Sequence, residues 1–298
     1  MDTEAEVAVI GLGRLGSAIA RRLLGQGWAM TVYNRTRASA SELETLGARI
    51  AATPAEAVKD AHIVISCVTD GAVLRRLSEG EEGFAKNMAA GSVHVSMGTL
   101  TPEDARALWA VHENCGTRYL NVPVQGRPDM VANGELVAWA AGSRELYDQI
   151  APLLSHLAVR RYWLGEDPGL SAVAKLSLNY LMYANIALFA ETMCIVERSG
   201  LPKAAFVDGL LETVFDAPLF RMIAHAFDST DHLAGGSDVS LTVKDLSQLW
   251  QHVAGLELHL PMLATVQEQY GATRDSGFGD LSQAAVIRMV TTPRHDAG

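Results

Sequence analysis

Apolar stretches and helical patterns alternate through the first 165 residues. Short runs rich in β-branched residues are followed by polar or glycine-containing turns and then by apolar positions at helical spacing. The expected strands are residues 6–10, 30–33, 49–51, 62–68, 93–97, 119–124, 136–141 and 161–164. Thr53-Pro54 and Thr101-Pro102, each with an acidic residue three positions after the threonine, indicate helix starts. This alternation predicts an α/β fold with a doubly wound, mainly parallel sheet.

The pattern changes after residue 165. Nothing breaks a helix between residues 170 and 199, and Gly200-Leu201-Pro202 then ends it. At 1.5 Å per residue, one helix of about 45 Å is expected. Residues 203–290 show mostly helical patterns. We therefore predict four parts: an α/β domain at 1–165, an interdomain helix at 166–200, an all-helical domain at 201–290 and a flexible tail at 291–298.

One stretch of the long helix, Leu176 to Val196, is apolar enough to resemble a membrane span. It carries Asn179, Asn185 and Glu191, which are costly in lipid, so a buried helix is expected instead. The N-terminus is acidic and lacks the basic start and apolar core of a signal peptide. Three scattered cysteines are too few for a disulfide framework. Together these features predict a cytoplasmic protein without a membrane partner.

The composition fits a folded chain, with 49% hydrophobic and 19% charged residues among 298. Lys and Arg number 24 against 34 Asp and Glu, a net charge of −10, and no basic run is present. A nucleic-acid partner is therefore not expected. The nine histidines show no metal-ligand spacing, so no metal is expected. The tryptophans at 109, 139, 163 and 250 are expected in the core or at an interface.

The motif Gly11-Leu12-Gly13-Arg14-Leu15-Gly16 joins an expected strand to an expected helix. In a dinucleotide-binding Rossmann fold, the first glycine permits a tight turn and the second lets the backbone approach a pyrophosphate. The third allows close packing of helix on strand, and the helix N-terminus faces the phosphates. The spacing alone is a weak signal. Its position between strand and helix favours a dinucleotide site over an ordinary glycine-rich turn.

The second expected strand ends in Asn34-Arg35-Thr36-Arg37. NAD-specific sites carry an acidic residue here, which binds the ribose 2′-hydroxyl, and this loop has none. Arg35 can pair with a 2′-phosphate, Thr36 can donate a hydrogen bond to it, and Arg37 adds positive charge. The loop therefore favours NADPH over NADH. The alternative is that both arginines are solvated loop residues.

Lys175 stands in an otherwise apolar part of the long helix. Ser171 lies four residues before it and Asn179 four residues after it, so the three share one helix face. An ammonium group is costly to bury unless it is paired or loses its proton. Lys175 is therefore a candidate proton donor to a developing alkoxide. The spacing leaves open that it reaches solvent or pairs with an acid such as Glu166.

These motifs resemble those of the β-hydroxyacid dehydrogenase family, with features of the related imine reductases, over nearly the whole chain. The family's GLGxMG is similar to residues 11–16, its NRT to residues 34–36 and its DxSTxxP to residues 96–102. Its DAPVSGG is similar to residues 121–127, its GxGxxxKxxN helix to residues 169–179 and its KDL to residues 244–246. The asparagine at 179 comes one position later than the helix motif places it.

The resemblance implies a role for each matching position. Lys175 is the expected general acid/base, and Asn179 is expected to hold the substrate. Six more residues are expected to line the site: Thr99 and Lys244 at the nicotinamide end, Val68 and Thr69 in the cofactor cleft, and Gln125 and Gly126 beside the substrate. The resemblance also implies a small-molecule substrate and a homodimer in which C-terminal helices pack across subunits.

Departures from the family pattern bear on the substrate. Gly98 and Gln125 replace serines of the family, and Arg127 is a gain that can pair with a substrate carboxylate. Residues 101–106, 165–170 and 277–285 are more similar to imine reductases, which usually place Asp or Tyr where this chain has Lys175.

A lysine stabilises an alkoxide and disfavours an iminium ion nearby. We therefore predict hydride transfer between NADP(H) and a small carbonyl or alcohol, of β-hydroxy acid or semialdehyde type. The alternatives are an imine reductase and, less favoured, a non-catalytic NADPH-binding protein.

Overall fold

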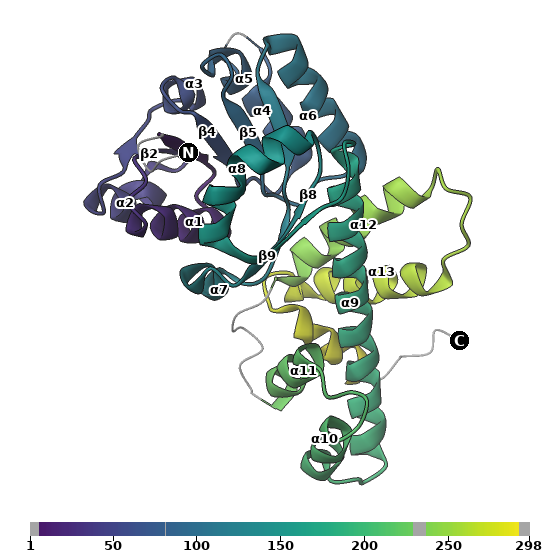
Figure 1. Ribbon diagram of the computed structural model, residues 1–298. Helices are drawn as coiled ribbons and strands as arrows, with labels where there is room; N and C mark the ends of the chain where they lie inside the picture. Colours follow the sequence, from purple (N-terminus) through teal and green to yellow (C-terminus); the bar gives the residue numbers. More distant parts are fainter. Residues whose placement is uncertain (1–5, 81, 229–236, 292–298) are drawn as a thin grey trace. The chain divides into compact units, whose positions relative to one another are not determined.

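A computed structural model of the protein describes residues 6–80, 82–228 and 237–291 (Figure 1). The chain divides into two compact units, residues 1–175 and residues 176–298. One continuous helix, α9 (Gly169–Arg198), contributes to both. Of the tail expected at 291–298, all but the first residue lies outside the described residues.

A six-stranded parallel sheet forms the centre of the first unit, with strand order β3-β2-β1-β4-β5-β6. The strands are β1 (Val7–Ile10), β2 (Met30–Tyr33), β3 (Arg49–Ile50), β4 (Ile63–Ser66), β5 (Val93–Ser96) and β6 (Arg118–Asn121). The chain order reverses between β1 and β4. At such a switch point the carboxyl ends of the strands border a binding crevice. The doubly wound parallel sheet predicted from the sequence is confirmed.

Helices follow the strands of the first unit along the chain. They are α1 (Arg14–Gly25), α2 (Ser41–Thr45), α3 (Pro54–Val58), α4 (Gly71–Ser78), α5 (Phe84–Asn87), α6 (Pro102–Cys115), α7 (Pro128–Asn133) and α8 (Arg144–Leu157). The predicted starts of α3 and α6 are confirmed: Thr53 Oγ1 accepts from the Glu56 N–H at 3.1 Å, and Thr101 Oγ1 from the Asp104 N–H at 3.0 Å. These caps satisfy backbone donors that the first turn of a helix leaves unpaired.

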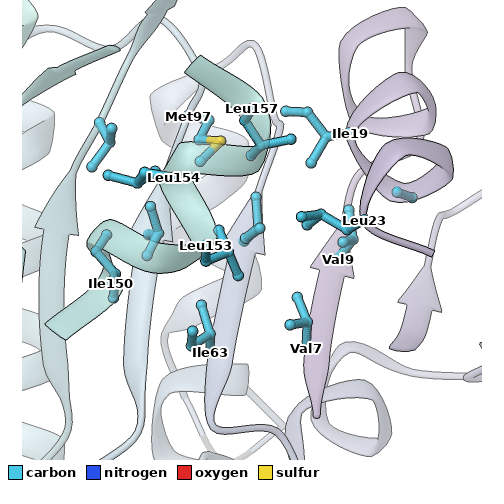
Figure 2. Close-up of a cluster of buried hydrophobic side chains, with 14 of the residues drawn as sticks. Val7, Val9, Ile19, Leu23, Ile63, Met97, Ile150, Leu153, Leu154 and Leu157 are labelled. Atoms are coloured by element: carbon cyan, nitrogen blue, oxygen red, sulfur yellow. The ribbon is translucent and has the colours of Figure 1, made fainter. Parts of the chain in front are cut away.

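Both faces of the large sheet are buried, which explains why its strands are nearly continuous apolar runs. All four residues of β1 are 0% exposed. Val7 and Val9 pack on one face with side chains of α1 and α8, as Figure 2 shows. Ala8 and Ile10 pack on the other face with side chains of α4 and α6. The alternation of side chains along one strand thus builds two separate cores.

A second, three-stranded sheet has the order β7-β8-β9. Its strands are β7 (Val124–Gln125), β8 (Leu136–Ala140) and β9 (Ala158–Trp163), with β7 antiparallel and β9 parallel to β8. The single strand expected at residues 119–124 was wrong, because the chain there leaves β6 of the large sheet for β7 of the small one. Pro123 lies at this transition, and a proline has no N–H with which to continue a ladder.

The second unit is helical, as predicted. It contains the rest of α9, then α10 (Lys203–Leu211), α11 (Pro218–Asp228), α12 (Val239–Val253), α13 (Pro261–Thr273), a π-helical turn (Arg274–Phe278), a 3₁₀ turn (Gln283–Val286) and α14 (Ile287–Thr291). Tyr183, Phe189 and Tyr270 are among the buried side chains of its core. The described part of the chain has no helix that is both long and apolar enough to cross a lipid bilayer.

Candidate functional site

The glycine motif forms the turn between β1 and α1. Gly11 has φ +91°, and a Cβ there would lie 2.9 Å from the carbonyl oxygen of Cys67. A Cβ at Gly16 would lie 2.0 Å from the carbonyl oxygen of Gly11. A Cβ at Gly13 would meet no atom within 4 Å, and both Gly13 and Arg14 are exposed at the start of α1. Gly11 and Gly16 are therefore required by packing. Gly13 leaves open space over the N-terminus of α1.

Asn34, at the end of β2, braces this turn. Its Oδ1 accepts from the Leu12 N–H at 3.0 Å, and its Nδ2 donates to the carbonyl oxygen of Thr36 at 3.0 Å. Leu12 is buried and Leu15 is half-buried, so both side chains anchor the turn. Arg35 and Thr36 are exposed. The loop is thus held by Asn34 and presents its next residues to solvent.

The carboxyl ends of β4 and β5 lie close together beside the glycine turn. A Cβ at Gly98 would lie 2.1 Å from the carbonyl oxygen of Val68, so only glycine fits there. Thr69 is exposed, and Val68 and Thr99 are half-buried. Burial raises the pKa of the Cys67 thiol to about 12, which keeps it protonated and unreactive. Val68, Thr69 and Thr99 therefore lie at the edge where a doubly wound sheet binds its ligand.

Lys175 lies on the first part of α9, against residues 121–125, which run from the end of β6 to the end of β7. Its Nζ donates to Gln125 Oε1 at 2.9 Å. One turn earlier, Ser171 Oγ donates to the carbonyl oxygens of Asn121 and Pro168, each at 3.1 Å. Ser171 and Lys175, four residues apart on α9, thus contact Asn121 and Gln125, which are also four residues apart. The structure brings together Lys175 and Gln125, two predicted site residues whose contact the sequence did not indicate.

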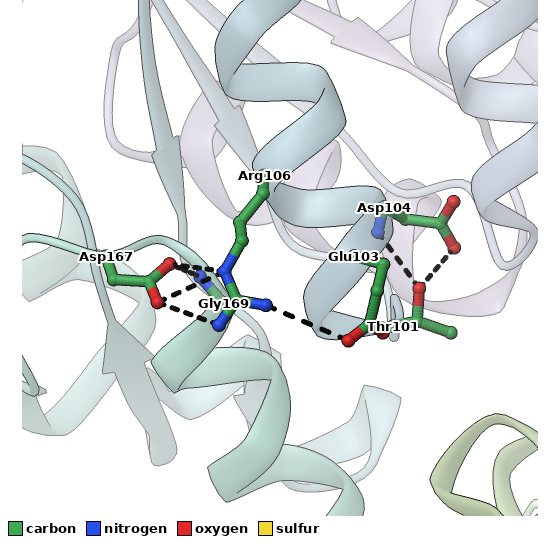
Figure 3. Close-up of polar contacts among 6 residues, drawn as sticks. All are labelled: Thr101, Glu103, Asp104, Arg106, Asp167 and Gly169. Atoms are coloured by element: carbon green, nitrogen blue, oxygen red, sulfur yellow. Dashed lines mark hydrogen bonds and ion pairs between the residues drawn. The ribbon is translucent and has the colours of Figure 1, made fainter. Parts of the chain in front are cut away.

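The start of α9 is anchored by an ion pair to α6, drawn in Figure 3. Arg106 donates to both carboxylate oxygens of Asp167, from Nε at 3.0 Å and from Nη2 at 2.8 Å. Asp167 Oδ1 also accepts from the Gly169 N–H at 2.9 Å. The hydrogen bonds from Arg106 hold the pKa of this carboxyl below its usual value. A Cβ at Gly169 would lie 2.9 Å from the guanidinium carbon.

In the second unit, Asp245 on α12 gathers three donors while only 3% exposed. Its Oδ2 accepts from Asn179 Nδ2 at 2.7 Å and from the Tyr183 hydroxyl at 2.9 Å, and its Oδ1 accepts from Lys244 Nζ at 2.9 Å. Burial and this carboxylate raise the pKa of Tyr183 well above its ordinary value, so the phenol remains a donor. Asn179 is therefore held in one orientation.

Sequence reasoning missed Asp245 and the Arg106–Asp167 pair. Asp245 was visible within the KDL motif, where only Lys244 received a role. The spacing of four between Asn179 and Tyr183 placed both on one helix face. The roles expected for Asn179 toward the substrate and for Lys244 toward the cofactor stay predictions.

The turn after β7 carries Gly126 and Arg127. Gly126 has φ +137°, and a Cβ there would lie 2.6 Å from the Leu136 side chain, so glycine is required. Arg127 donates to Asp129 from Nε at 3.0 Å and from Nη2 at 2.7 Å. Both side chains are roughly half exposed, at 45% and 63%. Arg127 is therefore held by an exposed carboxylate in the first turn of α7.

Two protein families match the chain. Residues 6–165 match the NAD binding domain of 6-phosphogluconate dehydrogenase, and residues 169–290 match the family described as NAD-binding of NADP-dependent 3-hydroxyisobutyrate dehydrogenase. Together with the parallel sheet and its switch point, these matches define an NAD(P)-binding oxidoreductase. The chain belongs to the 3-hydroxyisobutyrate dehydrogenase family, the β-hydroxyacid dehydrogenases that its motifs resemble.

Individual relatives agree with this assignment. The oxidoreductase YfjR of Bacillus subtilis (strain 168) is 32% identical, over 96% of this chain and 99% of its own. A solved 3-hydroxyisobutyrate dehydrogenase from Salmonella typhimurium is 25% identical, with a TM-score of 0.86 over 96% of this chain and 100% of its own. A reductive aminase from Aspergillus terreus, solved with NADPH and ethyl levulinate, is 25% identical, with a TM-score of 0.64 over 96% and 99%.

Proposed function

We propose that this protein is an NADPH-dependent oxidoreductase that interconverts a small carbonyl compound and its alcohol, of β-hydroxy acid or semialdehyde type. The observation that supports it most is the 2.9 Å hydrogen bond from Lys175 Nζ to Gln125 Oε1. This bond holds the amine of Lys175 in one position against Gln125. An ammonium group oriented in this way can stabilise a developing alkoxide and donate a proton to it.

The residues around the glycine turn fit NADPH. The open space over Gly13 suits a pyrophosphate at the N-terminus of α1. Arg35 and Thr36, both exposed, are placed to bind a 2′-phosphate, while Asn34 keeps their loop in position. Thr99, shortly after β5, is assigned to the nicotinamide end, and Val68, shortly after β4, is assigned to the cofactor cleft. NADPH, when bound, supplies the hydride.

The substrate-facing residues proposed are Gln125, Gly126 and Arg127. Because the Gln125 oxygen accepts from Lys175, its NH₂ group is left to donate to a second oxygen of the substrate. The Arg127–Asp129 pair is exposed, and exposed pairs contribute little free energy. A substrate carboxylate can therefore compete with Asp129 for the guanidinium group of Arg127.

A second candidate function is reduction of a C=N bond. It is favoured by the likeness to a reductive aminase and by the similarity of residues 101–106 and 165–170 to imine reductases. In that case Lys175 acts as a neutral amine or takes no part in proton transfer, because a positive charge disfavours an iminium ion.

One assay separates the two candidates. NADPH consumption is followed by absorbance with short semialdehydes and 3-oxo acids beside cyclic imines and ketone–amine pairs. Turnover confined to the carbonyl acids supports the dehydrogenase function. Turnover confined to the imines replaces it with the reductase function, and binding of NADPH without any turnover points to a non-catalytic protein.

We also propose that the protein is a homodimer. Leu181, Leu188 and Ile195 recur at intervals of seven residues along α9, so they follow one face of the helix. They are 57%, 57% and 66% exposed. Apolar stripes of this kind on a long helix are typical of an interface between helices. A second copy of the same chain offers the matching stripe.

A further inference from the structure

Two stacked aromatic rings lie on the outer face of the three-stranded sheet. Trp139 on β8 and Tyr162 on β9 are direct cross-strand partners, with ring centroids 4.9 Å apart and planes 18° from parallel. On the opposite face of β8, Leu136, Ala138 and Ala140 are buried in the core. Tyr162 is 46% exposed. Trp139 is half-buried and its Nε1 is buried, so the ring pair is only partly exposed.

Gln125 lies on the same face as the rings. It is the register partner of Val137, and Trp139 stands two residues further along β8. Side chains at alternate positions of a strand share a face, and such diagonal neighbours lie about 7–8 Å apart, within reach of aromatic and long side chains. Gln125 in turn accepts from Lys175 Nζ at 2.9 Å. One diagonal step thus separates the rings from the side chain that holds the proposed acid.

The surroundings of Gln125 differ in the two directions along the sheet. In one direction β7 ends, and Gly126 and Arg127 follow, with the guanidinium group of Arg127 paired with Asp129. In the other direction lie the rings of Trp139 and Tyr162. A molecule whose reacting oxygen accepts from Lys175 extends toward one side or the other. Exposed aromatic surface beside a site favours binding of apolar groups. The charged pair on the other side of Gln125 offers no such surface.

We propose that Trp139 and Tyr162 bind an apolar group of the substrate, a hydrocarbon ring or chain a few bonds from the reacting carbon. This rests on the proposed function, because it takes Lys175 as the group that meets the reacting atom. The rings then make the enzyme prefer substrates with such a group over short ones. Burying a phenyl ring is expected to raise the preference about 10- to 100-fold.

Two aldehydes with the same reacting group test the proposal: propanal and 3-phenylpropanal, which differ only in the phenyl ring. We expect a higher kcat/KM for 3-phenylpropanal. Trp139→Ala and Tyr162→Ala should each lower it about tenfold or more, with less than a threefold change for propanal. Trp139→Phe and Tyr162→Phe, which keep a ring, should retain most of the preference. Trp109→Ala, which removes an exposed tryptophan of α6, is the matched control.

A binding measurement keeps this test independent of turnover. With NADP⁺ present, 3-phenylpropan-1-ol is titrated into the wild type and each variant by calorimetry. Weaker binding in Trp139→Ala and Tyr162→Ala, but not in Trp109→Ala, supports the aromatic subsite. If, in addition, no compound of the carbonyl and imine panel is reduced, only the proposed function is contradicted. Equal binding in all variants, or equal loss of activity on both aldehydes, overturns the assignment of Trp139 and Tyr162.

Discussion

Lys175 carries the chemistry of the proposed function, so its removal is the most direct test. In Lys175→Ala we expect turnover to fall about 10²-fold or more, because positioned acid–base groups contribute on that scale. NADPH affinity should be unchanged, since the glycine turn and the loop after β2 are intact. Steady-state kinetics and a fluorescence titration with NADPH measure the two quantities. Lys203→Ala, an exposed lysine paired with Glu197, is the control. Unchanged turnover would remove Lys175 from the mechanism.

Arg35 determines the preference for NADPH in our proposal. Arg35→Ala should weaken NADPH binding about 10- to 100-fold, the scale of a hydrogen bond to a charged group, and NADH binding less than threefold. Dissociation constants for both cofactors provide the comparison. Arg21→Ala, which removes an exposed arginine of α1 paired with Glu42, should change neither constant. A similar loss for both cofactors would contradict a 2′-phosphate at Arg35.

Residues whose role depends on nearby backbone could be predicted from the sequence, and residues that meet across long separations could not. The glycine turn is local, because Gly11 and Gly16 contact each other and the adjacent strand end. Asp245 meets Asn179 across 66 positions and Asp167 meets Arg106 across 61. The spacing of residues along the chain cannot predict contacts between positions so far apart. Lys175 illustrates both cases, since its candidacy came from its apolar surroundings and its bond to Gln125 only from the fold.

Among the elements, the start of α9 depends on Gly169 because Arg106 occupies the space where a Cβ would lie. Gly169→Ala should lower the free energy of unfolding by about 1–3 kcal/mol, the usual cost of overpacking. In an Arg106→Ala background the same change should be close to neutral. Urea unfolding of the two single variants and the double variant completes the cycle. Additive effects would show that Arg106 does not cause the need for glycine.

Element boundaries followed the sequence where side chains cap or end a helix. Thr53 and Thr101 begin their helices as expected, because a threonine before a proline both caps and starts a helix. The division of residues 119–124 between two sheets was missed. Apolar runs show that a segment is buried, whereas the partner strand is chosen by contacts far along the chain.

At the scale of the whole molecule, the stripe on α9 predicts self-association. The wild type should sediment as a dimer, and Leu188→Glu should shift it to monomers, because a carboxylate would be buried without a partner. Analytical ultracentrifugation gives both masses. Val214→Glu, at a residue that is 92% exposed and off the stripe, should leave the dimer intact. A monomeric wild type, or a dimeric Leu188→Glu, would rule out this interface.

A buried histidine pair in the first unit is expected to make its stability depend on pH. His94 Nδ1 lies 2.8 Å from His112 Nε2, and both rings are 0% exposed. Burial lowers the pKa of His112 to about 4, and burial together with His112 lowers that of His94 well below its ordinary value. Below pH 6.5 the unfolded chain therefore binds protons that the folded chain excludes.

The free energy of unfolding should consequently fall as the pH drops from 6.5 toward 4, by up to about 3 kcal/mol for His112 alone. Above pH 6.5 this contribution no longer changes. Urea unfolding across this range measures the slope. His112→Gln should flatten it, while His62→Gln, at an exposed histidine, should not. An unchanged slope in His112→Gln would show that another group causes the acid sensitivity.

Because α9 belongs to both units without a break, Lys175 and Asn179 stand on opposite sides of the division yet one helical turn apart. Four residues of helix fix their axial separation at about 6 Å. Any hinge motion between the units that leaves α9 helical must therefore preserve this spacing. An insertion of one residue between them would turn one side chain about 100° away from the other. The spacing of Lys175 and Asn179 along α9 is thus independent of such motion and sensitive to a single added residue.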